Sequence, residues 1–146
     1  MLLYPVFLNL KGRSVLVVGA GPVGVRKARG LHAAGAKVSV VAQVFSQGLP
    51  ARVRRFKRRY RSSDVRGRLL VVAATDDATL NARIAREARS NGALVNRTDD
   101  ASACDYQVPA GFRKGKLAVA VSTGGRNPAL ARRIRLDLLL RYGGKS

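Results

Sequence analysis

The sequence is poor in cysteine, in long apolar runs and in acidic residues, and each of these absences excludes some classes of protein. Cys104 is its only cysteine, which excludes an internal disulfide and favours a reducing cytoplasm. No apolar run approaches the roughly 20 residues that a membrane-spanning helix needs, so no membrane association is expected. The apolar start, residues 1–12, lacks the basic region and cleavage site of a signal peptide, and we expect a structured leader there.

Acidic residues are also scarce, with 8 of them against 28 basic residues and a net charge of +20. Of the basic residues 21 are arginines, whose planar guanidinium suits paired hydrogen bonds to carboxylate or phosphate. The excess of positive charge predicts affinity for a polyanion but does not identify it. The alternative is a compositional bias toward basic residues that are spread over solvated helix faces. With 146 residues, 47% of them hydrophobic, the chain can bury the core of one domain with a short appendage.

The residues that usually bind metals are not grouped. His32, the only histidine, falls within a predicted helix and has no Cys, His or acidic partner at ligand spacing. Cys104 has no histidine nearby in the sequence, and we interpret it as a small buried residue rather than a nucleophile. We therefore predict no metal site made by the protein.

Short apolar runs alternate with helical patterns along residues 1–102. The basic run Arg52–Arg61 has Phe56 and Tyr60 in step with a period of two, which predicts a strand with one basic face. The order predicts an α/β fold, a Rossmann-like doubly wound and mostly parallel sheet. The other expected strands are residues 15–18, 37–41, 69–74 and 93–96, residues 45–50 are expected as a loop or short helix, and the expected helices are residues 22–34 and a segment within 75–92.

The pattern changes in residues 103–146, which we predict as a second region. Two extended runs flank "GFRKGK" and predict a β-hairpin. Asn127 as N-cap and Pro128 at the first helical position predict a helix up to Tyr142. Its apolar stripe is Leu130, Ile134, Leu138 and Leu139.

The residues Gly19-Ala20-Gly21-Pro22-Val23-Gly24 match G-x-G-x-x-G between a predicted strand and helix. The first glycine permits the turn, the second lets the backbone approach a pyrophosphate, and the third lets helix pack on strand. Phosphates would lie at the helix N-terminus, although glycines used only for packing are the alternative. The next strand leads to Gln43 and Val44 rather than to a carboxylate, so the motif leaves both NAD and NADP open.

Five stretches together carry a resemblance to a known family. They are "YPVFLNLKGRSVLVVGAGPVGVRKARGLHAAGAKVSVVA", "VVAATDDATLNARIAREAR", "LVNRTDD", "CDYQVPA" and "LAVAVSTGGRNPALARRIR". This combination resembles the precorrin-2 dehydrogenase family, the N-terminal module of siroheme synthases, from about Tyr4 to Leu140. The resemblance implies oxidation of the anionic tetrapyrrole precorrin-2 to sirohydrochlorin with NAD, and in bifunctional members insertion of ferrous iron. Members usually continue into a further helical region, so a sequence that stops at Ser146 is expected to be a minimal or truncated member, or one that keeps the fold with altered activity.

The resemblance also assigns roles to particular positions. It places the family's essential aspartate on Asp99, for which capping the turn after its strand is the structural alternative. It implies a substrate cleft along the "STGG" turn and a symmetric homodimer through the hairpin and last helix. The cofactor contacts fall on Gly19, Gly21, Pro22, Val23, Gly24, Gln43, Val44 and Thr75, and the substrate contacts on Ser122, Thr123, Gly124, Gly125, Arg126 and Asn127.

The charge of the chain fits two hypotheses. A substrate rich in carboxylates would be held by cations along the hairpin and turn, such as Arg113, Lys114, Lys116 and Arg126. The alternative is a non-catalytic module that senses nucleotides or binds polyanions or nucleic acid through the basic run. The glycine motif suits both hypotheses, whereas Asp99 and the "STGG" turn favour the enzyme.

Overall fold

The computed structural model describes residues 3–144, and these form two compact units. The larger unit is Phe7–Tyr106, and the smaller one contains residues 3–6 and 107–144. The predicted division after residue 102 stays a prediction, and the compact units separate after Tyr106. Each unit is described by itself.

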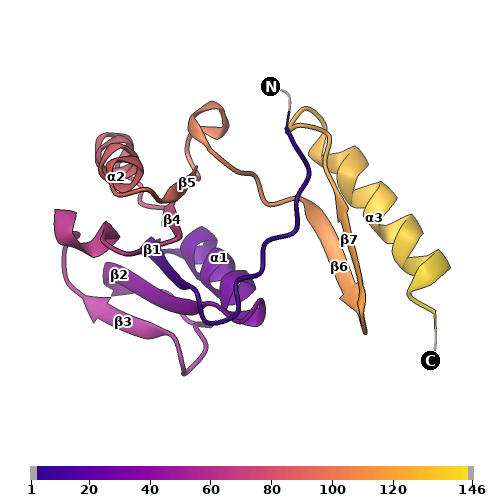
Figure 1. Ribbon diagram of the computed structural model, residues 1–146, viewed down its shortest axis with the longest axis horizontal. Helices are drawn as coiled ribbons and strands as arrows, with labels where there is room; N and C mark the ends of the chain where they lie inside the picture. Colours follow the sequence, from indigo (N-terminus) through magenta and orange to yellow (C-terminus); the bar gives the residue numbers. More distant parts are fainter. Residues whose placement is uncertain (1–2, 145–146) are drawn as a thin grey trace. The chain divides into compact units, whose positions relative to one another are not determined.

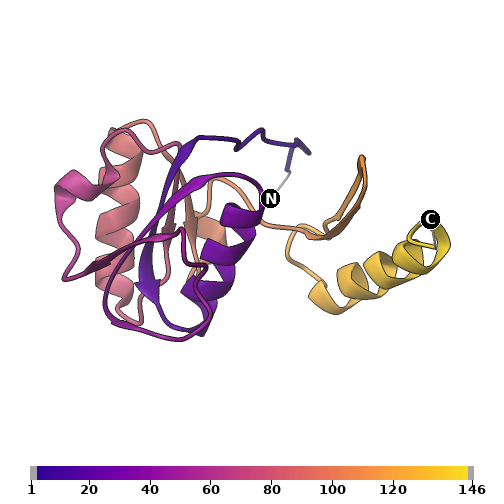
Figure 2. The same ribbon diagram turned by 90° about the horizontal axis from the view of Figure 1, so that it is seen from below.

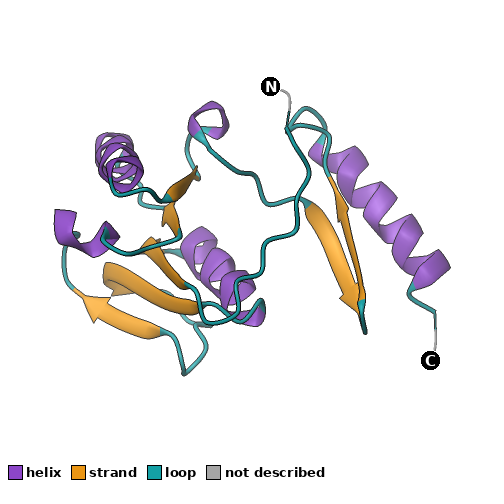
Figure 3. Ribbon diagram, in the orientation of Figure 1, coloured by secondary structure: helices purple, strands orange, loops and turns teal. Residues whose placement is uncertain are grey.

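The larger unit is built on a five-stranded parallel sheet with the order β3-β2-β1-β4-β5 (Figures 1 and 3). The chain runs outward from β1 to β3 and then returns to the other side of β1, so the order reverses between β1 and β4. Sheets of this kind bind their ligands at that reversal, beyond the carboxyl ends of the strands. The strands are β1 (Ser14–Ala20), β2 (Lys37–Phe45), β3 (Arg54–Lys57), β4 (Leu70–Ala73) and β5 (Leu94–Arg97).

Two helices cover the opposite faces of this sheet (Figure 2). Helix α1 (Pro22–Ala33) starts at Pro22, whose missing N–H costs nothing in a first turn. Helix α2 (Ala78–Ser90) is capped by Asp77, whose Oδ1 accepts a hydrogen bond of 3.0 Å from the Leu80 N–H. The predicted doubly wound α/β fold is therefore confirmed.

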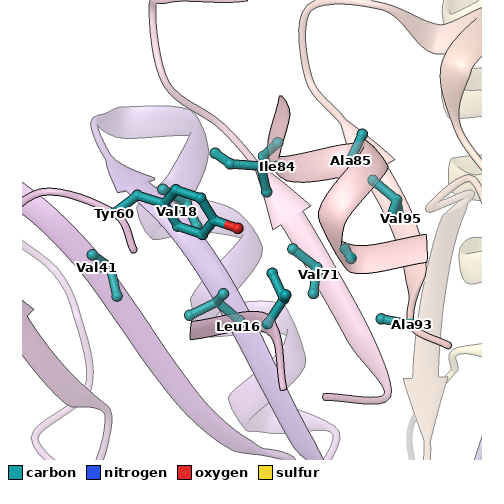
Figure 4. Close-up of a cluster of buried hydrophobic side chains, with 12 residues drawn as sticks. Leu16, Val18, Val41, Tyr60, Val71, Ile84, Ala85, Ala93 and Val95 are labelled. Carbon is teal, nitrogen blue, oxygen red and sulfur yellow. The ribbon is translucent and has the colours of Figure 1, made fainter. Parts of the chain in front are cut away.

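The period of two along β1 separates the core into two layers. Leu16 and Val18 point to the α2 side, where Ile84 packs on them, whereas Val15 and Val17 belong to the cluster on the α1 side (Figure 4). All five side chains are at most 2% exposed. A strand buried on both faces reads as a continuous apolar run, which is why β1 was recognisable in the sequence.

The basic run differs from its prediction. Only Arg54–Lys57 forms a strand, β3, and the chain then leaves the sheet. Tyr60 is 9% exposed and donates a hydrogen bond of 2.6 Å to Glu87, so it belongs to the core rather than to an aromatic surface stripe. The guanidinium of Arg58 lies over the Phe56 ring at 5.3 Å. The predicted strand with one basic face was wrong beyond Lys57, because Tyr60 is buried and Arg58 lies over Phe56, while Arg52, Arg54 and Arg59 stay exposed.

The short 3₁₀ helix η1 (Ser62–Val65) ties this run together through Asp64. Burial of Asp64 would raise the pKa of its carboxyl, but two hydrogen bonds from Arg58, at 2.9 and 2.7 Å, and one from the Arg61 N–H lower it. The ionised form is therefore favoured by folding. This contribution to stability is present above the unfolded pKa and is lost as the pH falls through the folded one.

We expect Asp64→Asn to lower the free energy of unfolding by about 1–2 kcal/mol at neutral pH, because charged hydrogen bonds are lost. The difference from the parent should persist down to about pH 4 and close below it, since Asp64 itself becomes protonated there. Urea unfolding at several pH values measures this. Asp137→Asn, which removes an exposed pair with Arg141, is the matched control and should cost only a few tenths of a kcal/mol.

The smaller unit is the predicted hairpin and helix, but the turn of the hairpin is shorter than predicted: residues 111–114 of "GFRKGK" belong to the first strand, and only Gly115 and Lys116 form the turn. Strands β6 (Ala110–Lys114) and β7 (Leu117–Val121) pair antiparallel, and α3 (Pro128–Tyr142) packs on both. Asn127 caps α3 through a bond of 2.9 Å from the Leu130 N–H, as predicted. Across residues 3–144, no helix combines the length and the hydropathy needed to cross a bilayer.

Candidate functional site

A pocket of about 900 Å³ opens at the carboxyl ends of the parallel strands. It lies where the order of the sheet reverses, the position at which such sheets bind ligands. Its walls are the ends of β1 and β2, the segments that follow β1, β3, β4 and β5, and part of α2. Of the predicted cofactor residues, Gly19, Gly21, Pro22, Val23, Gln43, Val44 and Thr75 line it, and Gly24 does not.

The three glycines of the motif have different surroundings. Gly19 has φ +100°, and a Cβ there would collide with the Ala74 carbonyl. A Cβ on Gly24 would collide with the carbonyl of Gly19, so the turn and α1 can approach only without side chains. A Cβ on Gly21 would meet nothing within 4 Å. The space in front of Gly21 is therefore open to a ligand, whereas Gly19 and Gly24 are needed by the fold itself.

The start of α1 is suited to an anion. Gly21 is the N-cap, and it provides no side-chain oxygen to the first N–H groups. The first turn contains no acidic residue, so the positive end of the helix dipole is not neutralised from within. Unpaired N–H groups and this dipole favour phosphate. The geometry supports a pyrophosphate above Gly21.

Asn81 is a residue of this site that sequence reasoning missed. It is fully buried on α2 and bonds the Thr75 loop three times: its Oδ1 accepts from the Thr75 N–H (3.2 Å) and hydroxyl (2.7 Å), and its Nδ2 donates to the Thr75 carbonyl (3.0 Å). The pocket wall after β4 is thereby fixed. The signal was an amide within the apolar stripe of α2, beside Leu80 and Ile84, where a polar side chain needs a partner.

Asp99 lies after β5, next to Thr98, which lines the pocket. Its carboxylate receives two hydrogen bonds from Arg97, at 2.7 and 3.3 Å. The Arg97 bond lowers the pKa of Asp99 against the opposing effect of burial, and Asn81 contributes less. The side chain of Asp99 is 26% exposed, so it is an ionised carboxylate that solvent or a ligand can reach. Asp99 itself is not part of the pocket wall.

The predicted substrate residues belong to the smaller unit and make a turn there. The Ser122 hydroxyl accepts from the Gly124 N–H (3.1 Å) and the Thr123 hydroxyl from the Asn127 N–H (3.0 Å). Gly124 and Gly125 both have positive φ. The side chains of Ser122, Thr123 and Asn127 therefore hold the turn, and Arg126 is exposed. Their contact with substrate stays a prediction.

Cys104 has a structural role in the larger unit. Its Sγ accepts from the Arg97 N–H at 3.2 Å and lies 3.2 Å from the Arg97 carbonyl, which holds the Asp99 loop against η2 (Ala101–Ala103). His32 is in the last turn of α1. Within residues 3–144, no three His, Cys, Asp or Glu side chains gather as a metal cluster.

Comparison with known proteins places the chain in a family. The family described as putative NAD(P)-binding matches residues 6–110. Siroheme synthases of Azotobacter vinelandii and Ectopseudomonas mendocina are 45% and 47% identical over 90% and 92% of this chain. The chain spans only 29–30% of the length of these relatives.

A solved structure of the same family has the same fold. SirC, a precorrin-2 dehydrogenase, matches 96% of this chain and 71% of its own, with a TM-score of 0.77 and 35% identity. The match includes the parallel sheet as well as the hairpin and helix region. The chain belongs to the putative NAD(P)-binding family and, within it, to the family of precorrin-2 dehydrogenases and siroheme synthase N-terminal modules.

Proposed function

We propose that this protein catalyses the NAD-dependent oxidation of precorrin-2 to sirohydrochlorin in siroheme synthesis. The observation that carries the proposal is the likeness to the precorrin-2 dehydrogenase SirC over 96% of this chain. The pocket at the reversal of the sheet adds a binding site of the right kind, because it combines a glycine turn with a helix N-terminus.

The residues present fit NAD. The open space before Gly21 admits a pyrophosphate, and Gln43 supplies an amide for the ribose. Thr75, fixed by Asn81, forms the wall after β4. When bound, NAD supplies the acceptor for the hydride that precorrin-2 loses. The tasks of the chain are to orient the cofactor, to hold the substrate and to accept a proton.

Asp99 is our candidate for the proton acceptor. Oxidation of the macrocycle releases a proton with the hydride, so a base beside the reacting carbon lowers the barrier. The Arg97 bonds keep the carboxylate ionised in the resting state, and its partial exposure leaves it accessible. The same bonds weaken it as a base, so proton transfer should be accompanied by a loosening of the Arg97 contact.

Substrate binding is assigned to cations and to the "STGG" turn of the smaller unit. Precorrin-2 carries peripheral carboxylates, and arginine binds these through paired hydrogen bonds. Arg113, Lys116 and Arg126 are exposed and suited to this role. Lys114 is not assigned to the substrate, because its Nζ donates a hydrogen bond to the Gly143 carbonyl at 2.9 Å.

The direct test is to supply the purified chain with NAD and enzymatically made precorrin-2. The proposal expects NADH to appear, measured by its absorbance, in equal amount to the sirohydrochlorin formed. NAD binding without turnover would show a nucleotide-binding module and reject the proposed activity. Iron insertion is a separate prediction, measured by adding ferrous iron to sirohydrochlorin and following siroheme formation.

We also propose that the protein is a homodimer, built from the hairpin and α3. Leu117, Ile134, Leu136 and Leu140 are 37–81% exposed in the smaller unit, which leaves much apolar surface uncovered. A second copy of this surface would cover it in a symmetric dimer.

We also propose that the protein works in the cytoplasm. Its one cysteine, Cys104, is a free thiol, which suits a reducing compartment.

The dimer should tighten as salt rises. Each protomer carries +20, so repulsion opposes association at low ionic strength, and salt screens it. Light scattering at low and high salt measures the mass. Leu136→Lys, placed on the exposed side of α3, should shift the chain to monomer, whereas Arg52→Gln in the other unit should not. A monomeric mass at both salt concentrations would refute the dimer.

A further inference from the structure

The adenosine end of the pocket lacks the group that usually selects NAD. In sheets of this type a carboxylate at the end of the second strand binds the ribose hydroxyls, and an arginine nearby accommodates the 2′-phosphate of NADP. Here Gln43 of β2 lines the pocket at that position. Its neutral amide can bond either a hydroxyl or a phosphate, so it repels neither cofactor.

The pairing of β3 with β2 brings two arginines to this place. Ala42 pairs with Lys57, and the Arg58 N–H donates to the Ala42 carbonyl at 3.1 Å. Arg58 and Arg59 therefore emerge from β3 beside Gln43, at the same edge of the sheet. Both line the pocket.

The two arginines differ in what they already bind. Arg58 makes two bonds to Asp64, at 2.9 and 2.7 Å, and a third to the Arg59 carbonyl, so its charge is compensated within the chain. Arg59 is exposed, and among residues 3–144 its side chain takes part in no ion pair or hydrogen bond. Arg59 is thus a cation of the pocket wall whose charge is available to a ligand.

The carboxylates of the pocket lie on another wall. Asp76 and Asp77 are in the loop from β4 to α2, and the sheet order puts β1 between β4 and β2. Asp77 is also occupied, because it caps α2. The neighbourhood of Gln43 and Arg59 is therefore positively charged, and Arg83, the third arginine of the wall, is paired with Glu87 at 3.3 Å.

We propose that this pocket accepts NADP as well as NAD, with Arg59 as the residue that binds the 2′-phosphate beside the neutral Gln43. The inference rests on the proposed cofactor site and adds to it a determinant of specificity. The ligand chemistry is that of a phosphomonoester on an adenosine ribose, for which a guanidinium is a two-bond partner.

Calorimetry of the full chain with NAD and NADP tests this. The parent should bind NADP within about tenfold of NAD. Arg59→Gln should weaken NADP by about tenfold to a hundredfold and leave NAD within about twofold, because only NADP carries the 2′-phosphate. Arg52→Gln is the matched control: it removes one charge from the same basic run, at an exposed residue outside the pocket wall, and should change neither affinity.

Two further probes keep the result decisive. Adenosine 2′,5′-bisphosphate should bind the parent more tightly than adenosine 5′-monophosphate, and Arg59→Gln should remove that advantage. Gln43→Glu should place the usual carboxylate beside the ribose and cut NADP affinity by about a hundredfold more than NAD affinity. Tight NAD binding with no measurable NADP binding, or equal NADP affinity in Arg59→Gln, overturns the inference and leaves the proposed function standing. Failure to bind either dinucleotide overturns both.

Discussion

Gly21→Asp should abolish NAD binding while leaving the chain folded. The introduced side chain would point into the open space before the helix N-terminus, where the pyrophosphate is placed. A carboxylate about 4 Å from a phosphate costs about 4 kcal/mol at the effective dielectric of a protein surface, or about 10³-fold in affinity. Calorimetry with NAD measures the loss. The same aspartate would be a good N-cap for α1 without ligand, so the melting temperature should stay the same or rise.

Two variants separate charge from space at this position. Gly21→Ala adds only a methyl group and should weaken NAD less than the aspartate does. Gly30→Asp adds the same charge on the exposed side of α1, where a Cβ meets nothing within 4 Å, and should leave NAD affinity unchanged. Unaltered NAD affinity in Gly21→Asp would mean that the pyrophosphate lies elsewhere.

Asp99→Ala should lower the turnover of precorrin-2 by roughly 10²–10⁴, the usual worth of general acid–base catalysis. NAD affinity should stay close to the parent, because Asp99 does not line the pocket, while loss of the two Arg97 bonds should lower the free energy of unfolding by about 1–2 kcal/mol. Steady-state kinetics and calorimetry give the two readouts. Asp100→Ala removes a neighbouring carboxylate whose hydrogen bonds come from Ser102 and which lies 3.8 Å from Arg97, and it should change turnover little. Parent-like turnover in Asp99→Ala would assign this aspartate a structural role only.

Arg97→Gln tests the role of Asp99 by removing the side chain that bonds its carboxylate. The Arg97 bonds lower the pKa of Asp99, so their loss should raise it and move the acid limb of kcat/KM to higher pH. The rate on the alkaline side of that limb should be retained, since the base itself remains. A general loss of rate at every pH, with an unmoved limb, would show that Arg97 serves another step.

The sequence predicted the elements whose signals are local. β1 is a continuous apolar run because both faces are buried, and Pro22 and Asn127 mark helix starts because their side chains act within one turn. The fold class followed from the alternation of such elements. The prediction of one strand over Arg52–Arg61 failed because the folded chain decides the partners of two of its residues. Tyr60 bonds Glu87, and Arg58 bonds Asp64.

The site was predictable in part for the same reason. The glycine motif specifies its own backbone geometry, so the turn before α1 could be anticipated. The bond network of Asn81 to Thr75 joins a helix to a loop and needed the folded chain, although an amide in an apolar stripe was a usable signal. The bonds between Arg97 and Asp99 connect residues two apart in the sequence, but no sequence pattern shows that two such side chains turn toward each other.

The unequal surroundings of Gly19, Gly21 and Gly24 imply two kinds of intolerance in a saturation mutagenesis experiment. A screen that measures only the amount of folded protein in cells should reject substitutions at Gly19 and Gly24, where a Cβ would collide with a backbone carbonyl. The same screen should keep many substitutions at Gly21, where a Cβ meets open space. Growth that depends on siroheme should remove those as well. A three-glycine motif that looks uniform in the sequence would then separate into two positions constrained by folding and one constrained by the ligand.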